Sequence, residues 1–292
     1  MKKTTKKVWR TGILSLVALN LLQAASSIFA AEPTFSTIDV PGATDTFAFE
    51  INSVGEIVGL YSDANGVGHG YLLSKGSFAT IAPPNAIDGW ASSINATGEI
   101  VGRYVDANGA EHGYLLSNGS FTTIDFPSAL STFEAAAINS IGEIVGLYFD
   151  ANGGHGYLLS KGGFNSVDFP GALFTGAFGI NPAGEIVGAY VDANGVEHGF
   201  LLSHGSFTTI DFPGAIWTDA FGNNAQGEIV GAYQSSDGTV HGFLLRQGTF
   251  TTIDPPGSLF TLGFSISPIG ETVGFYVDAN GAGHGFLLSR KQ

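Results

Sequence analysis

The stretch His241-Gly242-Phe243-Leu244-Leu245 decides the fold of this chain, because it is one of six copies of the same pattern. Each copy reads His-Gly, then Tyr or Phe, then Leu-Leu, with its histidine at His69, His112, His155, His198, His241 and His284. Neighbouring copies are 43 residues apart, and six such periods fill residues 35–292. A fixed period in this range is typical of supersecondary units that stack or surround an axis. The sequence therefore predicts a repeat protein, although the repeat itself names no ligand.

One repeat contains four short runs rich in β-branched and aromatic residues, separated by Gly, Asn, Asp and Ser. In the fifth repeat these runs cover residues 218–222, 227–233, 241–245 and 250–254. The Asp-Ala-Asn-Gly segments between the second and third runs, as at 63–66, are typical of tight hairpin turns. A longer link containing proline joins the fourth run to the next repeat, as expected where strand pairing ends. Four antiparallel strands and one crossover describe a propeller blade.

The ends of the repeat region predict how the ring closes. The chain begins with a run of the fourth type, residues 35–39, and its last repeat stops after a run of the third type, residues 284–289. Pairing of the two ends would complete the last blade and remove exposed sheet edges. We therefore predict an all-β protein, a six-bladed β-propeller of four-stranded antiparallel blades closed by the N-terminal strand. A β-solenoid is the alternative, which the four strands per repeat and the shifted frame disfavour.

Residues 1–30 have the pattern of a secretory signal peptide, which leaves 31–292 as the propeller domain. A basic start is followed by the short apolar run Ile13–Leu22 and by the small residues of 24–31. This apolar run is too short for a bilayer core of about 30 Å. We expect cleavage near Ala30 and release outside the cytoplasm, to the periplasm or the extracellular space, with no transmembrane span in the mature chain. An uncleaved membrane anchor is the alternative.

The charge of the mature chain limits its partners. The whole chain has a net charge of −14, and removal of five cations with residues 1–30 leaves 6 Lys and Arg against 25 Asp and Glu, or −19. Nucleic-acid binders need clustered Lys and Arg, so we expect no nucleic-acid partner. The absence of cysteine excludes disulfides and thiolate metal sites. We expect a monomer held together by its core.

The motif Ile51-Asn52-Ser53-Val54-Gly55-Glu56-Ile57-Val58-Gly59, followed by the His-Gly-Tyr of residues 69–71, resembles the HAF repeat of bacterial extracellular proteins. That family is named for His-Ala-Phe, whereas all six repeats of this chain have glycine at the second position. The resemblance covers all six repeats. It implies secretion and a β-rich repeat structure, and it implies no particular chemistry.

Two sets of residues invite a metal hypothesis. The Asp-x-Asn-Gly turns resemble the start of a calcium loop, but no glutamate closes the loop at its twelfth position. The six histidines should lie on third strands, one per blade and far from the axis, where each bonds within its own blade. We therefore predict structural turns and no metal or cofactor, with Ca²⁺ as the alternative.

Candidate ligand-binding positions are those where the repeats differ. Two such columns, each with a spacing of 43, precede the innermost strands: Asp45, Asp88, Ser131, Phe174, Trp217, Phe260, and Phe47, Trp90, Phe133, Gly176, Asp219, Leu262. We expect them to ring the mouth of a central funnel, with an acidic side and an aromatic side. Such a cleft suits a sugar or another ring-bearing ligand. In the alternative, these aromatic residues plug the funnel or pack between blades.

Three functional hypotheses follow. The first is a secreted ligand-binding propeller, with carbohydrate as the candidate ligand, and with a site made of Asp45, Asp88, Trp90, Phe174, Trp217 and Phe260. The second is an extracellular hydrolase or lyase, since paired carboxylates can cleave glycosidic bonds. Its candidate catalytic residues are Glu50, Asp45, Asp88 and Asp219, and Glu134 also lies in or beside an innermost strand. The third is a scaffold that binds a partner protein. The sequence leaves open whether the chain is an enzyme.

Overall fold

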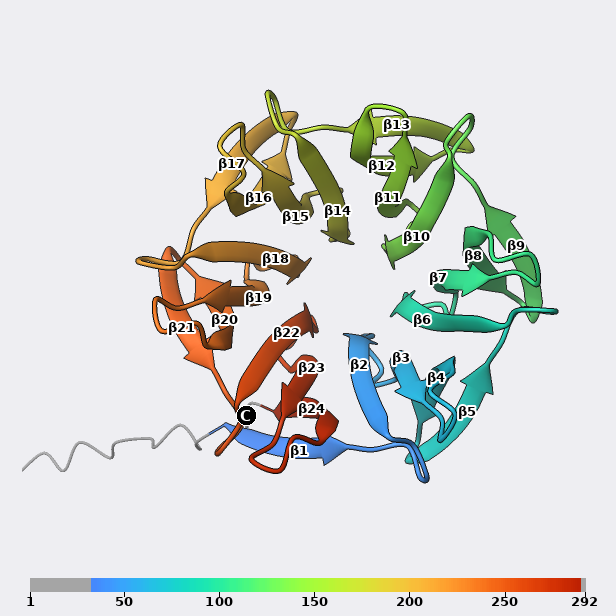
Figure 1. The fold of residues 1–292 in the computed structure, drawn as a ribbon, viewed down its shortest axis with the longest axis horizontal. Helices are drawn as coiled ribbons and strands as arrows, with labels where there is room; N and C mark the ends of the chain where they lie inside the picture. Colours follow the sequence, from blue (N-terminus) through green and yellow to red (C-terminus); the bar gives the residue numbers. More distant parts are fainter. Residues whose placement is uncertain (1–32, 290–292) are drawn as a thin grey trace, which may run out of the picture.

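The computed structural model describes residues 33–289, which form a closed ring of β-sheets around one axis (Figure 1). The predicted signal peptide, residues 1–30, lies outside the described residues. Between residues 33 and 289 there is no helix with the length and hydropathy needed to cross a membrane.

The 24 strands fall into four layers around the axis. The innermost strands are β2 (Asp45–Ile51), β6 (Asp88–Ile94), β10 (Ser131–Ile138), β14 (Phe174–Ile180), β18 (Trp217–Asn223) and β22 (Phe260–Ile266). The second strands are β3 (Ile57–Ser62), β7 (Ile100–Val105), β11 (Ile144–Asp150), β15 (Ile186–Val191), β19 (Ile229–Gln234) and β23 (Thr272–Val277). The third strands are β4 (Gly68–Ser74), β8 (Glu111–Ser117), β12 (Gly153–Ser160), β16 (Glu197–Ser203), β20 (Val240–Arg246) and β24 (Gly283–Ser289). The outermost strands are β5 (Ser77–Ile81), β9 (Ser120–Ile124), β13 (Gly163–Val167), β17 (Ser206–Ile210), β21 (Thr249–Ile253) and β1 (Thr34–Ile38).

The strands make six antiparallel blades, and the first strand of the chain completes the last of them. Blades 1 to 5 each contain four consecutive strands, from β2–β5 to β18–β21. In blade 6, β1 pairs antiparallel with β24 along its whole length, from Thr34 opposite Ser289 to Ile38 opposite Gly285. A single parallel bridge between Asp45 and Gly283 connects the sheets of blades 6 and 1. The prediction of a six-bladed propeller closed by its N-terminal strand is confirmed.

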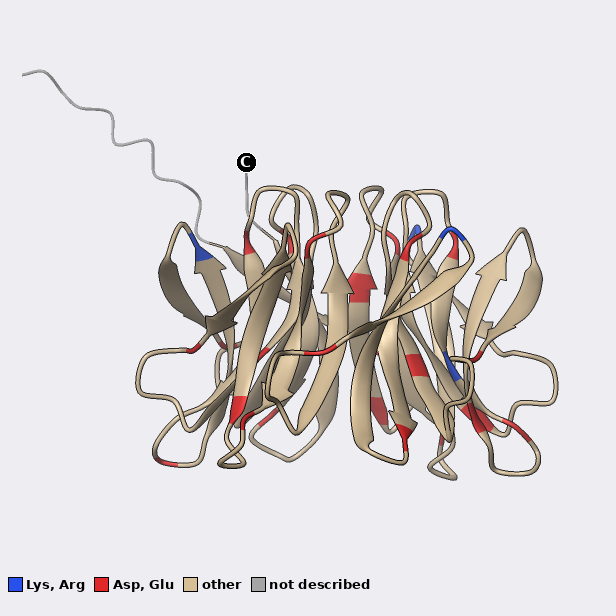
Figure 2. Ribbon diagram, turned by 90° about the horizontal axis from the view of Figure 1, so that it is seen from above, with Lys and Arg blue, Asp and Glu red and all other residues tan. Residues whose placement is uncertain are grey.

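The ring has two rims, because successive hairpins of a blade alternate between its ends (Figure 2). One rim carries the turns that leave the innermost and third strands, such as the turn at Asn52, and we call it the Asn rim. The opposite rim carries the Asp-Ala-Asn-Gly turns and the crossovers between blades, and we call it the Asp rim. Lys75, Lys161 and Arg246 all lie at the Asn rim. Arg103, the remaining Lys or Arg between residues 33 and 289, lies in the half of β7 nearer the Asp rim, where its Nη2 donates to Glu111 Oε1.

The hydrophobic core lies between adjacent blades. Each third strand buries one aromatic side chain to 1% exposure or less, and these are Tyr71, Tyr114, Tyr157, Phe200, Phe243 and Phe286. The clusters cross the seams between blades: Val145 of blade 3, for example, packs with Ala177 and Phe200 of blade 4. Burial of apolar surface therefore stabilises the ring only when each blade has its neighbours.

The glycines of the repeat motif allow close approaches of the backbone. The innermost strand has a register shift between Ala48 and Glu50, and a Cβ at Gly59 would lie 1.9 Å from the carbonyl oxygen of Phe47. A Cβ at Gly70 would lie 2.9 Å from the amide nitrogen of Ala91 in the next blade. This second contact explains why the third strand has glycine at this position.

A ring of asparagine side chains at the Asn rim connects the blades. The Asn52 Oδ1 accepts bonds from the amides of Val54 and Glu56, while its Nδ2 donates to Glu56 Oε2 at 3.0 Å. The same Nδ2 reaches the carbonyl oxygen of Asn95 in the next blade at 3.3 Å. This link between blades recurs with N–O distances of 3.1–3.3 Å from Asn52, Asn95, Asn139, Asn181 and Asn224. Every hydrogen-bonding atom of the amide is thus used.

Blade 6 differs at this position. It carries Ser267, whose hydroxyl accepts a bond from the amide of Glu271. No asparagine bridge of this kind is present between the described residues of blades 6 and 1.

We predict that Asn139→Ala lowers the free energy of unfolding by about 2 kcal/mol, because it leaves buried backbone groups without partners. Conversely, Ser267→Asn should raise it by about 1 kcal/mol by adding the missing link to Asn52. Urea denaturation followed by circular dichroism measures both effects. Gln226→Ala, on the exposed part of an equivalent hairpin, is the control and should unfold like the parent protein. An unchanged midpoint for Asn139→Ala would show that the amide ring contributes nothing.

Candidate functional site

A cavity of about 250 Å³ lies on the axis of the ring. All six innermost strands contribute to its wall, which consists of Phe49, Glu50, Trp90, Ser92, Glu134, Ala136, Phe178, Phe221 and Phe264. Since the innermost strands run from the Asp rim to the Asn rim, Phe49 and Trp90 lie on the Asp-rim side of Glu50. A second hollow of about 130 Å³ lies on the other side of Glu50, towards the Asn rim.

Four phenylalanines form an aromatic half-ring around the cavity. Phe49 and Phe264 meet edge to face with centroids 5.0 Å apart. Phe221 lies 5.4 Å from Phe264 and 5.8 Å from Phe178. Blades 2 and 3 contribute only small side chains at the equivalent positions, so the aromatic ring is open on that side. The cavity exists because these two blades depart from the repeat.

Glu134 lies in this gap, opposite the half-ring. It accepts hydrogen bonds from the Trp90 indole at 3.3 Å and from the Ser92 hydroxyl at 3.5 Å. Burial raises the pKa of Glu134, and the Trp90 bond, the nearby Arg103 charge and the Ser92 bond partly offset this effect. The Glu134 carboxyl is therefore poorly solvated and oriented by its neighbours.

Arg103 supports this wall from behind. Its guanidinium lies 4.3 Å from the centre of the Trp90 ring and 4.7 Å from that of Phe133. Its Nη2 donates to Glu111 Oε1 at 2.8 Å. This cation–π contact fixes the plane of Trp90. The positive charge of Arg103 also favours the ionised form of the Glu134 carboxyl.

Glu50 lines both hollows. Burial raises the pKa of Glu50 to about 7, although bonds from the Ser265 hydroxyl, the Ile51 amide and the Ser93 hydroxyl oppose the shift. Near neutral pH this group is therefore divided between a carboxylate and a neutral acid, and it can accept or donate a hydrogen bond on the axis.

The structure brings three of the residues named from the sequence, Trp90, Glu50 and Glu134, into the cavity. The others of that set lie nearer the Asp rim, and Asp45, Asp88 and Phe174 contact the preceding blade across a seam. Asp88 Oδ2 accepts a bond from the amide of Gly68 at 3.0 Å, and Asp45 forms the bridge to Gly283. The ring centroids of Phe174 and Phe149 are 6.4 Å apart, and those of Phe260 and Phe275 are 6.2 Å apart. Trp217 is the first residue of β18 and pairs with Gln234.

Asp219 also belongs to a seam, between blades 4 and 5. Burial and the Glu197 carboxylate raise its pKa to about 8, and its Oδ1 is buried without a hydrogen-bond partner among the described residues.

One alignment of the repeats was wrong. A strict spacing of 43 puts Phe133 in the column of Trp90, but the pairing places Glu134 there, opposite Leu147. Strand β10 has an additional register shift between Thr132 and Glu134, so blade 3 holds one more residue in its innermost strand. The inserted residue moves Glu134 into the cavity and Ala136 into the aromatic column.

The sequence contained signals for the residues that were missed. The half-ring residues Phe49, Phe178, Phe221 and Phe264 share the 43-residue register. The extra residue of blade 3 appears in the asparagine spacing, since Asn139 follows Asn95 by 44 residues and Asn181 follows Asn139 by 42.

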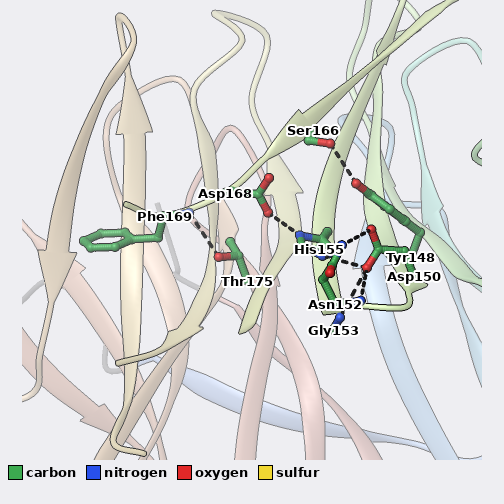
Figure 3. Close-up of polar contacts among 9 residues, drawn as sticks. All are labelled: Tyr148, Asp150, Asn152, Gly153, His155, Ser166, Asp168, Phe169 and Thr175. Carbon is green, nitrogen blue, oxygen red and sulfur yellow. Dashed lines mark hydrogen bonds and ion pairs between the residues drawn. The ribbon is translucent and has the colours of Figure 1, made fainter. Parts of the chain in front are cut away.

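The repeated histidines take part in networks within single blades, as predicted (Figure 3). In blade 3, His155 Nδ1 lies 2.8 Å from Asp168 of the crossover and its Nε2 lies 3.2 Å from Asp150 of the turn. The imidazole stacks on Tyr148, whose hydroxyl bonds to Ser166 at 2.7 Å. The contact with the crossover acid recurs for His112, His198, His241 and His284. In blade 1 the crossover has Ala82, and His69 bonds to Asp63 of the turn.

The turn acids have local partners as well. Asp63 Oδ1 accepts bonds from the amides of Asn65 and Val67 at 2.8 and 3.1 Å, so its carboxylate stabilises the hairpin. Within residues 33–289, no three His, Asp or Glu side chains are grouped in a way that could hold a metal ion.

No family model matches the chain, and no curated protein is significantly similar to it. The resemblance to HAF repeats thus stays a prediction. Solved propellers are similar in fold. The lectin of Aleuria aurantia, described as a six-bladed β-propeller that recognises fucose, is 14% identical over 88% of this chain and 97% of its own, with a TM-score of 0.50.

Two further structures extend this comparison. The SapL1 lectin in complex with α-methyl fucoside is 12% identical over 85% of this chain and 96% of its own, with a TM-score of 0.55. TolB from Acinetobacter baumannii is 15% identical over 86% of this chain and 65% of its own, also with a TM-score of 0.55. At these identities the likeness shows the fold alone. The chain is a six-bladed β-propeller.

The histidine networks predict a pH-dependent contribution to stability. Partial burial tends to lower the pKa of His155, but the hydrogen bond and charge of Asp168, together with Asp150, outweigh it and raise that pKa. A raised histidine pKa stabilises the fold fully below the ordinary value near 6.5, and this contribution is lost as the pH rises through the folded-state value. We therefore expect Asp168→Ala to lower the melting temperature more at about pH 5.5 than at about pH 8.5.

Thermal denaturation at the two pH values measures this difference. Alanine is the natural residue at the equivalent position of blade 1, Ala82, so the variant should fold. Asp168→Asn keeps an acceptor oxygen without the charge and isolates the electrostatic part. Equal losses at both pH values would refute the ionic contribution.

Proposed function

We propose that this chain is a secreted carbohydrate-binding propeller, and that it binds one sugar ring in the central cavity. The observation that carries the proposal is the aromatic half-ring opposite Trp90, Ser92 and Glu134. Aromatic faces pack against the C–H face of a sugar, while carboxylate and hydroxyl groups bond to its hydroxyls. Phe49 and Phe264 would supply the stacking faces, and Glu134 would accept hydrogen bonds.

The electrostatics of the cavity support a neutral ligand. Glu50 and Glu134 disfavour a phosphate or carboxylate, and the guanidinium of Arg103 behind the wall is already engaged by Glu111 and by the Trp90 and Phe133 rings. The volume of about 250 Å³ is just below the usual range for ligand pockets, about 300–1,000 Å³, and suits a single ring. The lectins with a similar fold bind fucose or a fucoside, which adds a ligand class to test.

The proposal includes export. The basic and apolar pattern of residues 1–30 supports it, and a glycan ligand would be met outside the cytoplasm. N-terminal sequencing of the protein recovered from the periplasm or the medium tests whether cleavage occurs near Ala30.

We predict that Ala136→Phe reduces affinity for the bound sugar at least about tenfold, because it closes the gap in the half-ring and fills the cavity. Phenylalanine is the natural residue at this position in four blades, so the variant should fold. Isothermal titration calorimetry against a panel of methyl glycosides, including α-methyl-L-fucoside, measures the change. Ala183→Phe makes the same substitution on an exposed hairpin and should bind like the parent. Undiminished binding by Ala136→Phe would exclude the cavity as the site.

A second candidate function, glycoside cleavage, is favoured by one observation: Glu50 and Glu134 line the same cavity and both have raised pKa values. A carboxyl with a pKa near 7 can serve as a general acid while a second carboxylate assists. If the chain is a hydrolase, Glu50→Gln should reduce turnover at least about 100-fold and retain sugar binding. Product release from aryl glycosides and oligosaccharides measures turnover. Turnover that survives in both Glu50→Gln and Glu134→Gln would reject this function.

A further inference from the structure

A separate hollow of about 450 Å³ opens at the Asp rim, in the seam between blades 2 and 3. Its walls are the end of the β7–β8 hairpin, the start of β8, the crossover from β9 and the start of β10. It shares no lining residue with the central cavity. The hollow therefore requires an explanation of its own.

The identity of residue 131 explains why the seam is open here. The first residues of three innermost strands, Asp45, Asp88 and Phe174, contact the preceding blade across the seam. Asp88 fills the seam between blades 1 and 2 by bonding to Gly68, and the hollow there is only about 40 Å³. Blades 4, 5 and 6 place Phe174, Trp217 and Phe260 at this position. Blade 3 has Ser131, the smallest side chain of the set.

The polar groups of the hollow are held in place by their neighbours. Glu111 is fixed through Oε1 by Arg103, which is only 9% exposed and clamped between two aromatic rings. Asp125 is fixed by His112, whose Nδ1 lies 3.0 and 3.1 Å from its two oxygens. The positive charge of Arg103 thus compensates the negative charge of Glu111. Both carboxylates remain available as acceptors for donors that enter the hollow.

The remaining wall is apolar. Leu130 stands at its edge with 77% of its surface exposed, and Val105, Ala110 and Ala129 complete it. Acceptor groups on one side and aliphatic groups on the other suit a ligand with hydroxyl donors and C–H faces. An anionic ligand would meet two carboxylates, and the nearby guanidinium of Arg103 is already paired with Glu111.

We infer that the seam between blades 2 and 3 is a second binding site for a hydroxyl-rich ring, separate from the central cavity. The inference takes its ligand class from the proposed function and adds a second place for it. Ser131 leaves the space, Glu111 and Asp125 accept hydrogen bonds, and Leu130 covers one face of the ring. The parent protein then binds two sugar equivalents, one on the axis and one at the rim.

The test uses two substitutions, each of which introduces the large side chain that other blades of this chain carry at the equivalent position. Ser131→Trp introduces the residue found at Trp217 and fills the seam, whereas Ala136→Phe fills the central cavity. Each variant, the double variant and the parent are titrated with the same methyl glycosides, including α-methyl-L-fucoside, and bound equivalents at saturation are counted by equilibrium dialysis. We expect two equivalents for the parent, one for each single variant and none for the double variant. Circular dichroism melting confirms the fold of each.

A second variant makes the test independent of any strain from tryptophan. Asp125→Ala copies Ala82 of blade 1 and should weaken the seam site at least about fivefold while the central site is unchanged. If Ser131→Trp and Asp125→Ala both bind like the parent, the seam site is rejected, and loss of all binding in Ala136→Phe would then leave the proposed central site standing. If Ala136→Phe changes nothing and Ser131→Trp abolishes binding, the central site fails and the seam site holds. Absence of binding by the parent to every glycoside would reject both.

Discussion

Packing between neighbouring blades is the interaction on which the whole structure depends. No blade encloses a core of its own, since the buried aromatic of each third strand packs against residues of the adjacent blade. A row of such sheets would leave apolar faces at its two ends, and closing the ring removes both. Pairing of β1 with β24 and the asparagine links at the Asn rim hold this closed arrangement together, and the axis and seams acquire their shapes from it.

Candidate sites arise where the six blades stop being equivalent. Four phenylalanines would converge with two more if every blade followed the same pattern, and the axis would be filled by aromatic rings. Ser92 of blade 2 and Ala136 of blade 3 interrupt that packing, and one added residue in β10, balanced by one fewer in the following part of blade 3, places Glu134 in the gap. The same pair of blades carries Arg103 and Ser131. The central cavity and the seam hollow therefore share a wall built around Arg103, with Trp90 and Glu134 on one side and Glu111 on the other.

The fold was predictable from the sequence because its main determinant is periodic. The spacing of the His-Gly-Tyr/Phe motif set the number of blades, and the run at residues 35–39 set the closure. The histidine networks followed from placing one histidine on each third strand beside its own crossover. Positions within a strand were harder to predict. Whether a side chain points to the axis or into a seam depends on the bulge of the innermost strand, which moves Phe49 to the axis and leaves Asp45 in the seam.

The position of Glu134 needed the same kind of information. Counting from the histidines assumes a constant number of residues between the innermost and third strands, and blade 3 violates that assumption while preserving the total. Counting from the asparagines would have revealed the shift. The seam hollow required three-dimensional pairing, because its walls come from two repeats and its size depends on a single absent side chain.

Because blade 6 has Ser267 in place of asparagine, one joint of the ring is weaker than the others at the Asn rim. Five of the joints between blades carry a hydrogen bond from an asparagine side-chain amide. Among the described residues, the sixth joint, between blades 6 and 1, carries no such bond. At the Asn rim, blades 6 and 1 should therefore separate before other neighbours do, while the Asp45–Gly283 bridge and the bond from Ser265 to Glu50 still connect them further along the seam. Local opening at the Asn-rim end of this joint should therefore expose the chain to proteases before the other joints open.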